Sequence, residues 1–243
     1  MSILPSVRAN LAERLIFNFR MAPEALAAFL PVPWLTPDVV RGYGVVSFCL
    51  LDLRQITLAP LPAVAGLASV SCAPRFAVRD RSGGGDAPAV YVTERQTNSA
   101  FGAWFTSLGF SAPHPHVTVD LRRLGDRTEI RVEDGKAGEV FYATVGEAQH
   151  AESKLFDSPE VFAAFIAGGV TSYGTSRHKG KLTKVDLHKL DCVYTPLAAS
   201  NVSGPLVQAW HSAGGVLDSA YRTMGGQYEW EYHGLVEEAT GRP

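Results

Sequence analysis

The chain has 243 residues, of which 46% are apolar and 19% are charged, and its formal net charge is -2. This length suits one large domain, and the apolar fraction is enough to bury a sizeable core. No long basic run is present, which argues against a general nucleic-acid binder and against a protein that binds acidic membranes by charge. We therefore expect a single domain over residues 1–243.

The three cysteines, Cys49, Cys72 and Cys192, are far apart in the sequence. Their spacing matches neither a zinc site nor a disulfide framework, so we expect inert thiols and no bound metal. The N-terminus lacks the pattern of a signal peptide, and no segment approaches the run of about 20 apolar residues that spans a bilayer. These patterns predict a cytoplasmic protein with no membrane partner.

The first elements of the chain are a strand and a short helix. Residues 15–20 alternate between apolar and other side chains, which predicts a strand. Pro23 suits the first position of a helix, and Pro31 would end that helix. Further helices are predicted from Ser158, as N-cap, to the Gly168-Gly169 pair, over residues 205–211 and over residues 216–224.

Between these helices the sequence favours strands. Apolar, β-branched and aromatic residues alternate over 44–51, 68–78, 89–98, 116–121, 128–132, 139–145, 182–194 and 227–233. Asp134-Gly135 predicts a hairpin turn, and the glycine-rich residues 80–86 predict a solvated hairpin tip. We therefore expect an α+β fold, with a mainly antiparallel, β-barrel-like sheet and a few packed helices.

Three stretches, taken in order, resemble one known superfamily. The first is Phe-Arg-Met-Ala-Pro-Glu-Ala-Leu at 19–26 followed by Leu-Pro-Val-Pro at 30–33. The second runs from residue 91 through the glycine-containing segment 101–110, and the third covers parts of 172–197. Over residues 14 to 200 the chain resembles the acetoacetate decarboxylase-like superfamily, closest to its uncharacterised bacterial branch. The resemblance implies a homo-oligomer. We expect a small-molecule ligand and no cofactor.

The chain departs from this superfamily at the position of its catalytic lysines. Family decarboxylases carry two adjacent lysines just after a proline, where one amine forms a Schiff base and its neighbour lowers the pKa of that amine. Here the corresponding stretch is Ser-Ala-Pro-His-Pro-His at 111–116, and the first lysine of the chain is Lys136. We therefore predict that the chain does not decarboxylate acetoacetate through the family's imine.

His114 and His116 are candidate catalytic residues at this position. In an extended segment their side chains point to the same side, so they can share one pocket or one metal ion. Histidine is a common acid or base near neutral pH. The alternative is a proline-stiffened surface loop whose histidines face water. A metal site would need further ligands that the sequence does not identify.

The strand predicted over 89–98 carries further candidates. Alternation would place Tyr91 and Arg95 on one face and Glu94 on the other. Arg95 can bind a carboxylate through two hydrogen bonds, and Glu94 can act as a base. Arg20, at the junction of the first strand and helix, is a second candidate for anion binding. The alternative is a strand with a solvated outer face.

Later in the chain, residues 182–194 alternate charged and apolar side chains. If Lys184 or His188 points inward, it can replace the missing family amine from another strand. The basic run 176–181 is typical of a solvated turn, and the aromatic run 227–233 is typical of core or subunit packing. We include His188 among the substrate-binding candidates.

These features favour a protein that binds a small carbonyl or carboxylate compound. The catalytic candidates are His114, His116 and Glu94, and the substrate-binding candidates are Arg95, Arg20, Tyr91 and His188. If the protein is an enzyme, these groups suit acid/base chemistry of the lyase, isomerase or hydratase type. A non-catalytic ligand sensor and a structural or partner-binding protein are the alternatives, and the polarity of the internal cavity distinguishes them.

Overall fold

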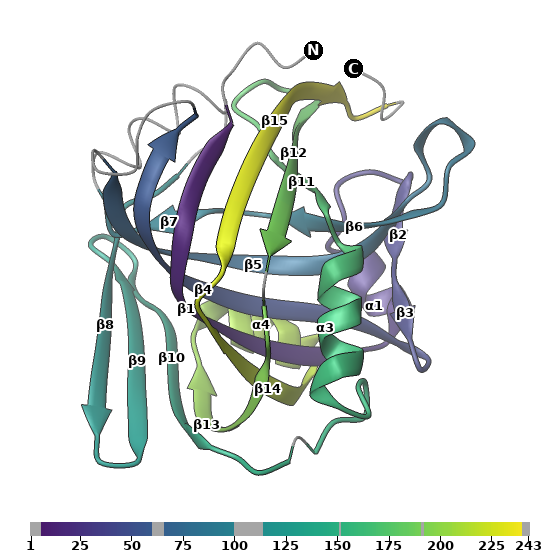
Figure 1. Cartoon of the computed structure of the whole chain (residues 1–243). Helices are drawn as coiled ribbons and strands as arrows, with labels where there is room; N and C mark the ends of the chain where they lie inside the picture. Colours follow the sequence, from purple (N-terminus) through teal and green to yellow (C-terminus); the bar gives the residue numbers. More distant parts are fainter. Residues whose placement is uncertain (1–5, 60–65, 100–113, 151, 191, 240–243) are drawn as a thin grey trace.

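A computed structural model describes residues 6–59, 66–99, 114–150, 152–190 and 192–239. Within these residues, one mixed sheet of fifteen strands dominates the molecule, with three α-helices packed on it (Figure 1). The helices are α1 (Pro23–Ala27), α3 (Pro159–Gly168) and α4 (Pro205–Ser212). The expected α+β class, with a largely antiparallel sheet, is confirmed.

The central strand is β1 (Val7–Met21). One edge of β1 pairs along its length with β4 (Tyr43–Leu58), and the other edge pairs first with β15 (Gln227–Glu237) and then with β14 (Val216–Met224). From β4 the sheet continues through β5 (Leu67–Asp80), β6 (Ala87–Val92), β11 (Thr171–Thr175), β12 (Lys181–Leu190) and back to β15. This path returns to β1, so the sheet is ring-like.

A second group of strands extends from β14. It consists of β13 (Thr195–Ser203), β10 (Gly138–Glu147), β9 (Arg127–Asp134) and β8 (Val117–Leu124), and the β8–β9 hairpin projects from the body of the molecule (Figure 1). Three short strands complete the sheet: β2 (Leu35–Pro37), β3 (Val39–Val40) and β7 (Gln96–Thr97). A 3-10 turn, η2 (Ser82–Gly84), forms the tip of the β5–β6 hairpin, as the glycine-rich sequence predicted.

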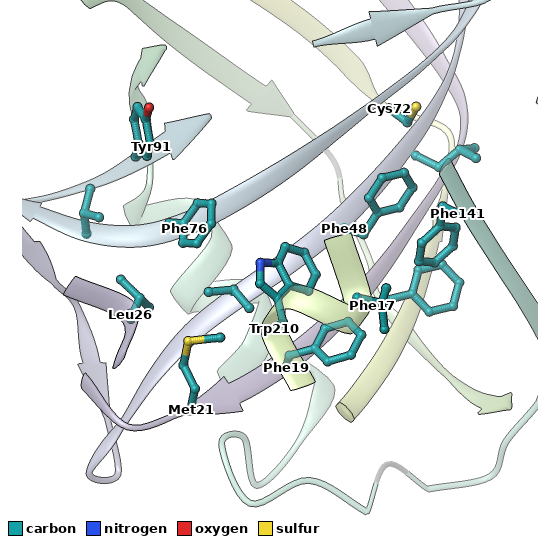
Figure 2. Close-up of a cluster of buried hydrophobic side chains, with 14 of the residues drawn as sticks. Phe17, Phe19, Met21, Leu26, Phe48, Cys72, Phe76, Tyr91, Phe141 and Trp210 are labelled. Atoms are coloured by element: carbon teal, nitrogen blue, oxygen red, sulfur yellow. The ribbon is translucent and has the colours of Figure 1, made fainter. Parts of the chain in front are cut away.

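Along each strand, alternate side chains face opposite sides of the sheet, and each side holds a separate apolar core. We call the first the α4-side core; it holds Phe17, Phe48 and Phe76, with Trp210 from α4 (Figure 2). Phe48 stacks on Phe141 with ring centroids 4.0 Å apart.

The second core, which we call the α3-side core, is built from the intervening residues of the same strands. It includes Ile16 and Cys49, and it packs against Phe162 of α3. Phe162 stacks on Tyr221 of β14 with ring centroids 4.1 Å apart, which fixes α3 on this face of the sheet.

Two of the predicted helices have the expected boundaries. The Ser158 hydroxyl accepts a hydrogen bond from the backbone N–H of Val161 at 3.4 Å and caps α3, and α4 begins at Pro205 as expected. The helix predicted from Pro23 is present but ends after five residues.

The helix predicted over 216–224 is wrong, because this segment is strand β14. Its residues pair one to one with Glu13–Arg20 of β1, apart from a bulge after Asn18. The free edge of β1 needs hydrogen-bond partners for its backbone, and this requirement overrides the weak helical pattern.

The single strand predicted over 89–98 is also wrong. β6 ends at Val92 and β7 begins at Gln96, so Thr93–Arg95 lie outside regular structure. The alternation argument that placed Tyr91 and Arg95 on one face therefore does not hold. In the described part of the chain, no helix combines the length and apolarity needed to cross a membrane.

Candidate functional site

A pocket opens on the α3 side of the sheet, between α3 and strands β1, β4, β5, β6 and β12. Its volume, measured as space open to the centres of water molecules, is about 40 Å³. One water needs roughly 10–15 Å³ on this measure, so the pocket has room for several waters or for the polar end of a small ligand. Its polar lining consists of Arg14, Asn18, Asp38, Ser47, Arg75 and Lys189.

The floor of the pocket is a row of polar side chains across three neighbouring strands. Asn18 of β1 is the register partner of Ser47 of β4, and Ser47 is the partner of Arg75 of β5. Residues in register on adjacent strands face the same side of a sheet, so these three side chains lie next to one another. The flanking Phe17 and Phe48 face the other side and belong to the α4-side core.

Arg14 is fully buried beside this row, with 1% of its surface exposed. Its Nε donates to Cys49 Sγ at 3.2 Å, and its Nη1 donates to the hydroxyl oxygens of Tyr194 and Tyr228, both at 3.1 Å. Burial alone would raise the pKa of Cys49, but the positive charges of Arg14 and Arg75 lower it below its usual value. The guanidinium is thus fixed in place by one thiol and two phenols.

Lys189, at the end of β12, forms one wall of the pocket. Its Nζ donates to the backbone carbonyl oxygen of Ile166 at 2.7 Å and to that of Gly169 at 3.4 Å, at the C-terminal end of α3. Burial, followed by the positive charges of Arg14 and Arg75, lowers the pKa of this amine to about 7.

The pocket carries an excess of positive charge. Among the described residues, Asp38 is the one carboxylate in the lining, and its Oδ1 lies 3.6 Å from Nη1 of Arg79, outside the lining. In the described part of the chain, no ion pair joins Arg14, Arg75 or Lys189 to a carboxylate.

Arg75 shows the consequence of this excess most clearly. Its Nε is buried and has no hydrogen-bond partner among the described residues. Burial lowers its pKa most, the negative charge available on Cys49 opposes this shift, and repulsion from Arg14 adds to it. A buried N–H of a cation without a hydrogen-bond partner is costly, and a bound anion would supply that partner.

None of the residues predicted from the sequence is in the lining of this pocket. Arg95 interacts electrostatically with the lining residue Arg75. Burial and then the positive charge of Arg75 lower the pKa of Arg95 to about 10. Its Nη2 donates to Ser172 Oγ at 3.1 Å. Glu94 is half-buried and accepts a hydrogen bond from Gln96 Nε2 at 3.2 Å.

Tyr91 and Arg20 point elsewhere. Tyr91 is buried in the α4-side core near Phe76, as Figure 2 shows, and burial raises the pKa of its hydroxyl. Arg20 Nε lies 3.5 Å from Asp218 Oδ1, and its guanidinium stacks over the ring of Tyr43.

The predicted histidines lie apart from the pocket lining. His114 is half-buried, and His116 is exposed, with its Nε2 3.2 Å from the backbone oxygen of Asn98. His188 is exposed on β12. The described residues contain no group of three or more His, Cys, Asp or Glu side chains that could hold a metal ion. The segment that precedes His114, residues 100–113, is outside the described residues.

The residues that do line the pocket carried a sequence signal that the patterns above did not use. Arg14 lies in an apolar strand ahead of Leu-Ile-Phe, and Arg75 lies between Ala-Pro and Phe-Ala-Val. An arginine directly beside a run of buried apolar residues in a strand indicates either an edge position or a polar site in the interior. Lys189 offered no comparable signal, because charged residues surround it.

The fold has clear counterparts among solved structures. The chain is similar to acetoacetate decarboxylase from Legionella pneumophila, with 14% identity and a TM-score of 0.69 over 96% of this chain and 87% of that one. An acetoacetate decarboxylase-like enzyme from Sphingomonas wittichii has 14% identity and a TM-score of 0.59 over 95% and 92% of the two chains. The enduracididine biosynthesis enzyme MppR, in complex with pyruvate, has 12% identity and a TM-score of 0.62 over 99% and 92%.

At these identities the likeness establishes a shared fold, and the fold is that of the acetoacetate decarboxylase-like enzymes. Residues 8–208 match the model of DUF2071, a family described as an uncharacterized conserved protein, and the chain belongs to that family. A search of curated proteins finds no match. The resemblance drawn from the sequence is confirmed.

Proposed function

We propose that this protein binds a small organic anion, bearing a carboxylate and a carbonyl group, in the pocket beneath α3. The observation that carries the proposal is the group of three cationic side chains, Arg14, Arg75 and Lys189, which line one pocket without a carboxylate partner among the described residues. A guanidinium fork matches the two oxygens of a carboxylate.

The rest of the lining suits the orientation of such a ligand. Ser47 and Asn18 place a hydroxyl and an amide on the same floor as Arg75, where they can bond to a carbonyl oxygen. Apolar side chains such as Val45, Ala77 and Phe165 form the remaining walls. A small number of polar groups among apolar walls is typical of small-molecule sites.

We further propose acid/base chemistry in this pocket, without the lysine pair of the family decarboxylases. Lys189, with a pKa of about 7, can exchange a proton at neutral pH. His114, His116 and Glu94 are outside the pocket lining and remain proposed acid/base groups only for a ligand that extends beyond it. Arg95 remains a proposed contributor to the positive potential. Arg20, Tyr91 and His188 remain proposed contacts only for a ligand that extends beyond this pocket.

The test is binding of pyruvate, lactate and acetone to the full chain, measured by calorimetry and thermal shift. We expect pyruvate and lactate to bind and the uncharged acetone to bind far more weakly. Arg75→Met should weaken pyruvate binding about tenfold or more, since hydrogen bonds to charged groups contribute about 1.5–3 kcal/mol.

Arg54→Met is the matched control for this experiment. Arg54 is an exposed arginine of the neighbouring strand β4, and it pairs with Asp52 at 2.8 Å, away from the pocket lining. Equal loss of binding in the two variants, or no binding of either acid by the parent protein, would contradict the proposal.

A further inference from the structure

The strand β8 is the terminal strand of the sheet that the structure describes. Among the described residues, its eight positions pair with β9 and with no other strand, and an isolated bridge between Thr97 and His116 lies ahead of it. The strand at the other end of the sheet, β3, has only two residues. β8 therefore presents a long free edge, on a hairpin that projects from the body of the molecule (Figure 1).

The charges on this edge have opposite signs. A free edge offers its backbone N–H and C=O groups to another strand, and charged side chains commonly prevent that pairing. On β8 the side chains of Asp120 and Arg122 are 43% and 70% exposed, and Arg122 Nε donates to Asp120 Oδ2 at 2.7 Å. An acid and a base two residues apart lie on the same face of a strand. This edge can therefore be complementary to a second copy of itself.

We propose that two copies of this chain associate through β8, with their β8 strands antiparallel about a two-fold axis at Leu121. In this register Asp120 of each copy lies opposite Arg122 of the other, and Leu121 lies opposite Leu121. Opposed side chains of antiparallel strands share a face, with Cβ atoms about 4.5–5.5 Å apart, so each acid reaches a base of the other copy. The interface is isologous, as in most two-fold dimers.

Charge selects this register over the two nearest alternatives. An axis at Asp120 would place the two Asp120 carboxylates opposite each other, and an axis at Arg122 would do the same with the two guanidiniums. Like charges directly opposite one another destabilise a strand pair. The backbone hydrogen bonds of the joined edges then supply affinity, whereas Asp120 and Arg122 determine the register.

The other side chains of β8 fit the same register. Leu124 is 55% exposed in the single chain, and the pairing places it opposite Thr118 of the second copy. Val119 and Leu121 are half-buried against the α4-side core. Arg123 lies opposite Val119 of the second copy, where the aliphatic part of the arginine side chain can cover apolar surface. Because the strands run in opposite directions, the two bodies lie at opposite ends of the joined hairpins.

This association is independent of the proposed anion binding. Among the described residues, β8 contributes none to the pocket lining. Loss of the dimer should therefore leave pyruvate binding unchanged, and the two proposals can fail separately.

The experiment measures self-association of the full chain by analytical ultracentrifugation over a range of concentrations. We expect a reversible dimer. Asp120→Arg and Arg122→Asp each replace two attractive contacts of the dimer with two repulsive ones, and each should raise the Kd about tenfold or more. In an equimolar mixture of these variants, the two arginines of one chain face the two aspartates of the other. A heterodimer should then form with about the parental Kd.

Arg54→Asp is the matched control. Arg54 Nη2 lies 2.8 Å from Asp52 Oδ2, so the two form the same kind of exposed arginine–aspartate pair two residues apart. Their strand, β4, is paired with β1 on one edge and with β5 on the other. Arg54→Asp should therefore leave the Kd of the dimer unchanged, and circular dichroism checks that all three variants are folded.

Three results would overturn the proposal. The first is a parent chain that stays monomeric at every concentration, which would leave the edge to a different strand or to none. The second is a dimer whose Kd responds equally to Arg54→Asp and to the β8 variants. The third is a mixture of Asp120→Arg and Arg122→Asp that stays monomeric, because the register centred on Leu121 requires the two chains to pair.

Discussion

The two faces of the sheet are built from the same strands but differ in what they bury. In β1, β4 and β5 one set of alternate residues supplies Phe17, Phe48 and Phe76 to the α4-side core, where aromatic rings fill the space (Figure 2). The other set supplies Asn18, Ser47 and Arg75 to the pocket beneath α3. The first face is packed for stability, whereas the second keeps buried charges that packing alone does not require.

The largest expected effect tests the α4-side core. Phe48→Ala removes a ring that is 1% exposed and that stacks on Phe141 with centroids 4.0 Å apart. We expect the free energy of unfolding to fall by about 3–5 kcal/mol, measured by urea denaturation. Phe48→Leu should cost considerably less, because it keeps most of the apolar volume. A loss below about 1 kcal/mol for the alanine variant would mean that this face is not the main source of stability.

A substitution on the pocket face should leave the free energy of unfolding unchanged or raise it. Arg75→Met replaces a cation whose buried Nε has no partner with an apolar side chain of similar length. We expect stability to stay the same or rise by about 1 kcal/mol or more, while pyruvate no longer stabilises the protein. The measurement is denaturation with and without pyruvate. A loss of several kcal/mol in the ligand-free variant would show that Arg75 is part of a packed structural network instead.

The pH dependence of stability offers a third test of the charged face. The pKa of Lys189 is lowered from 10.5 to about 7 by burial and by Arg14 and Arg75. Between these two values the unfolded chain holds a proton that the folded protein has released. The free energy of unfolding therefore rises with pH from about 7 to 10.5, and the penalty for burying the ammonium is complete below pH 7.

Comparison with Lys189→Met isolates this contribution. The stability of the parent protein relative to this variant should increase steadily across that window. Parallel pH profiles for the parent and Lys189→Met would show that the amine is not perturbed.

The smallest expected effect concerns the helix that covers the pocket. Ser158→Ala removes the hydroxyl that accepts from Val161 N at 3.4 Å and caps α3. We expect a loss of about 1 kcal/mol in denaturation experiments, and Ser158→Asp should recover most of it. Pyruvate binding should weaken as well, because Ile166 and Gly169 at the other end of α3 line the pocket. Unchanged binding in a clearly destabilised Ser158→Ala would separate the helix start from the site.

Much of the fold could be predicted from local patterns. The prolines and the serine cap of α3 and α4 indicated where these helices begin, and the period-two alternation identified most of the strands. The segment 216–224 was misassigned because its strand character comes from pairing with Glu13–Arg20, more than 190 residues earlier in the chain. Local propensity contains no information about so distant a partner.

The candidate site was much harder to predict than the fold. The motifs that attracted attention in the sequence, the histidine pair and the Glu94-Arg95 dipeptide, do not line the pocket, whereas Arg14, Arg75 and Lys189 do. These three residues come from three strands, and only the two arginines carry a signal in their own segments. A shared pocket becomes visible only when the strands are in register.

The sequence by itself determined the superfamily, the strand-rich α+β class and the absence of lysine before Lys136, because these follow from local order, periodicity and composition. Only the tertiary structure decided which face of each strand is apolar, where β14 pairs and which cations share one pocket. The reason is that burial and electrostatic coupling are properties of neighbours in space. Sheet pairing brings Asn18, Ser47 and Arg75 together across gaps of about thirty residues. Hydrogen bonds from Lys189 to the end of α3 hold its side chain at the same pocket.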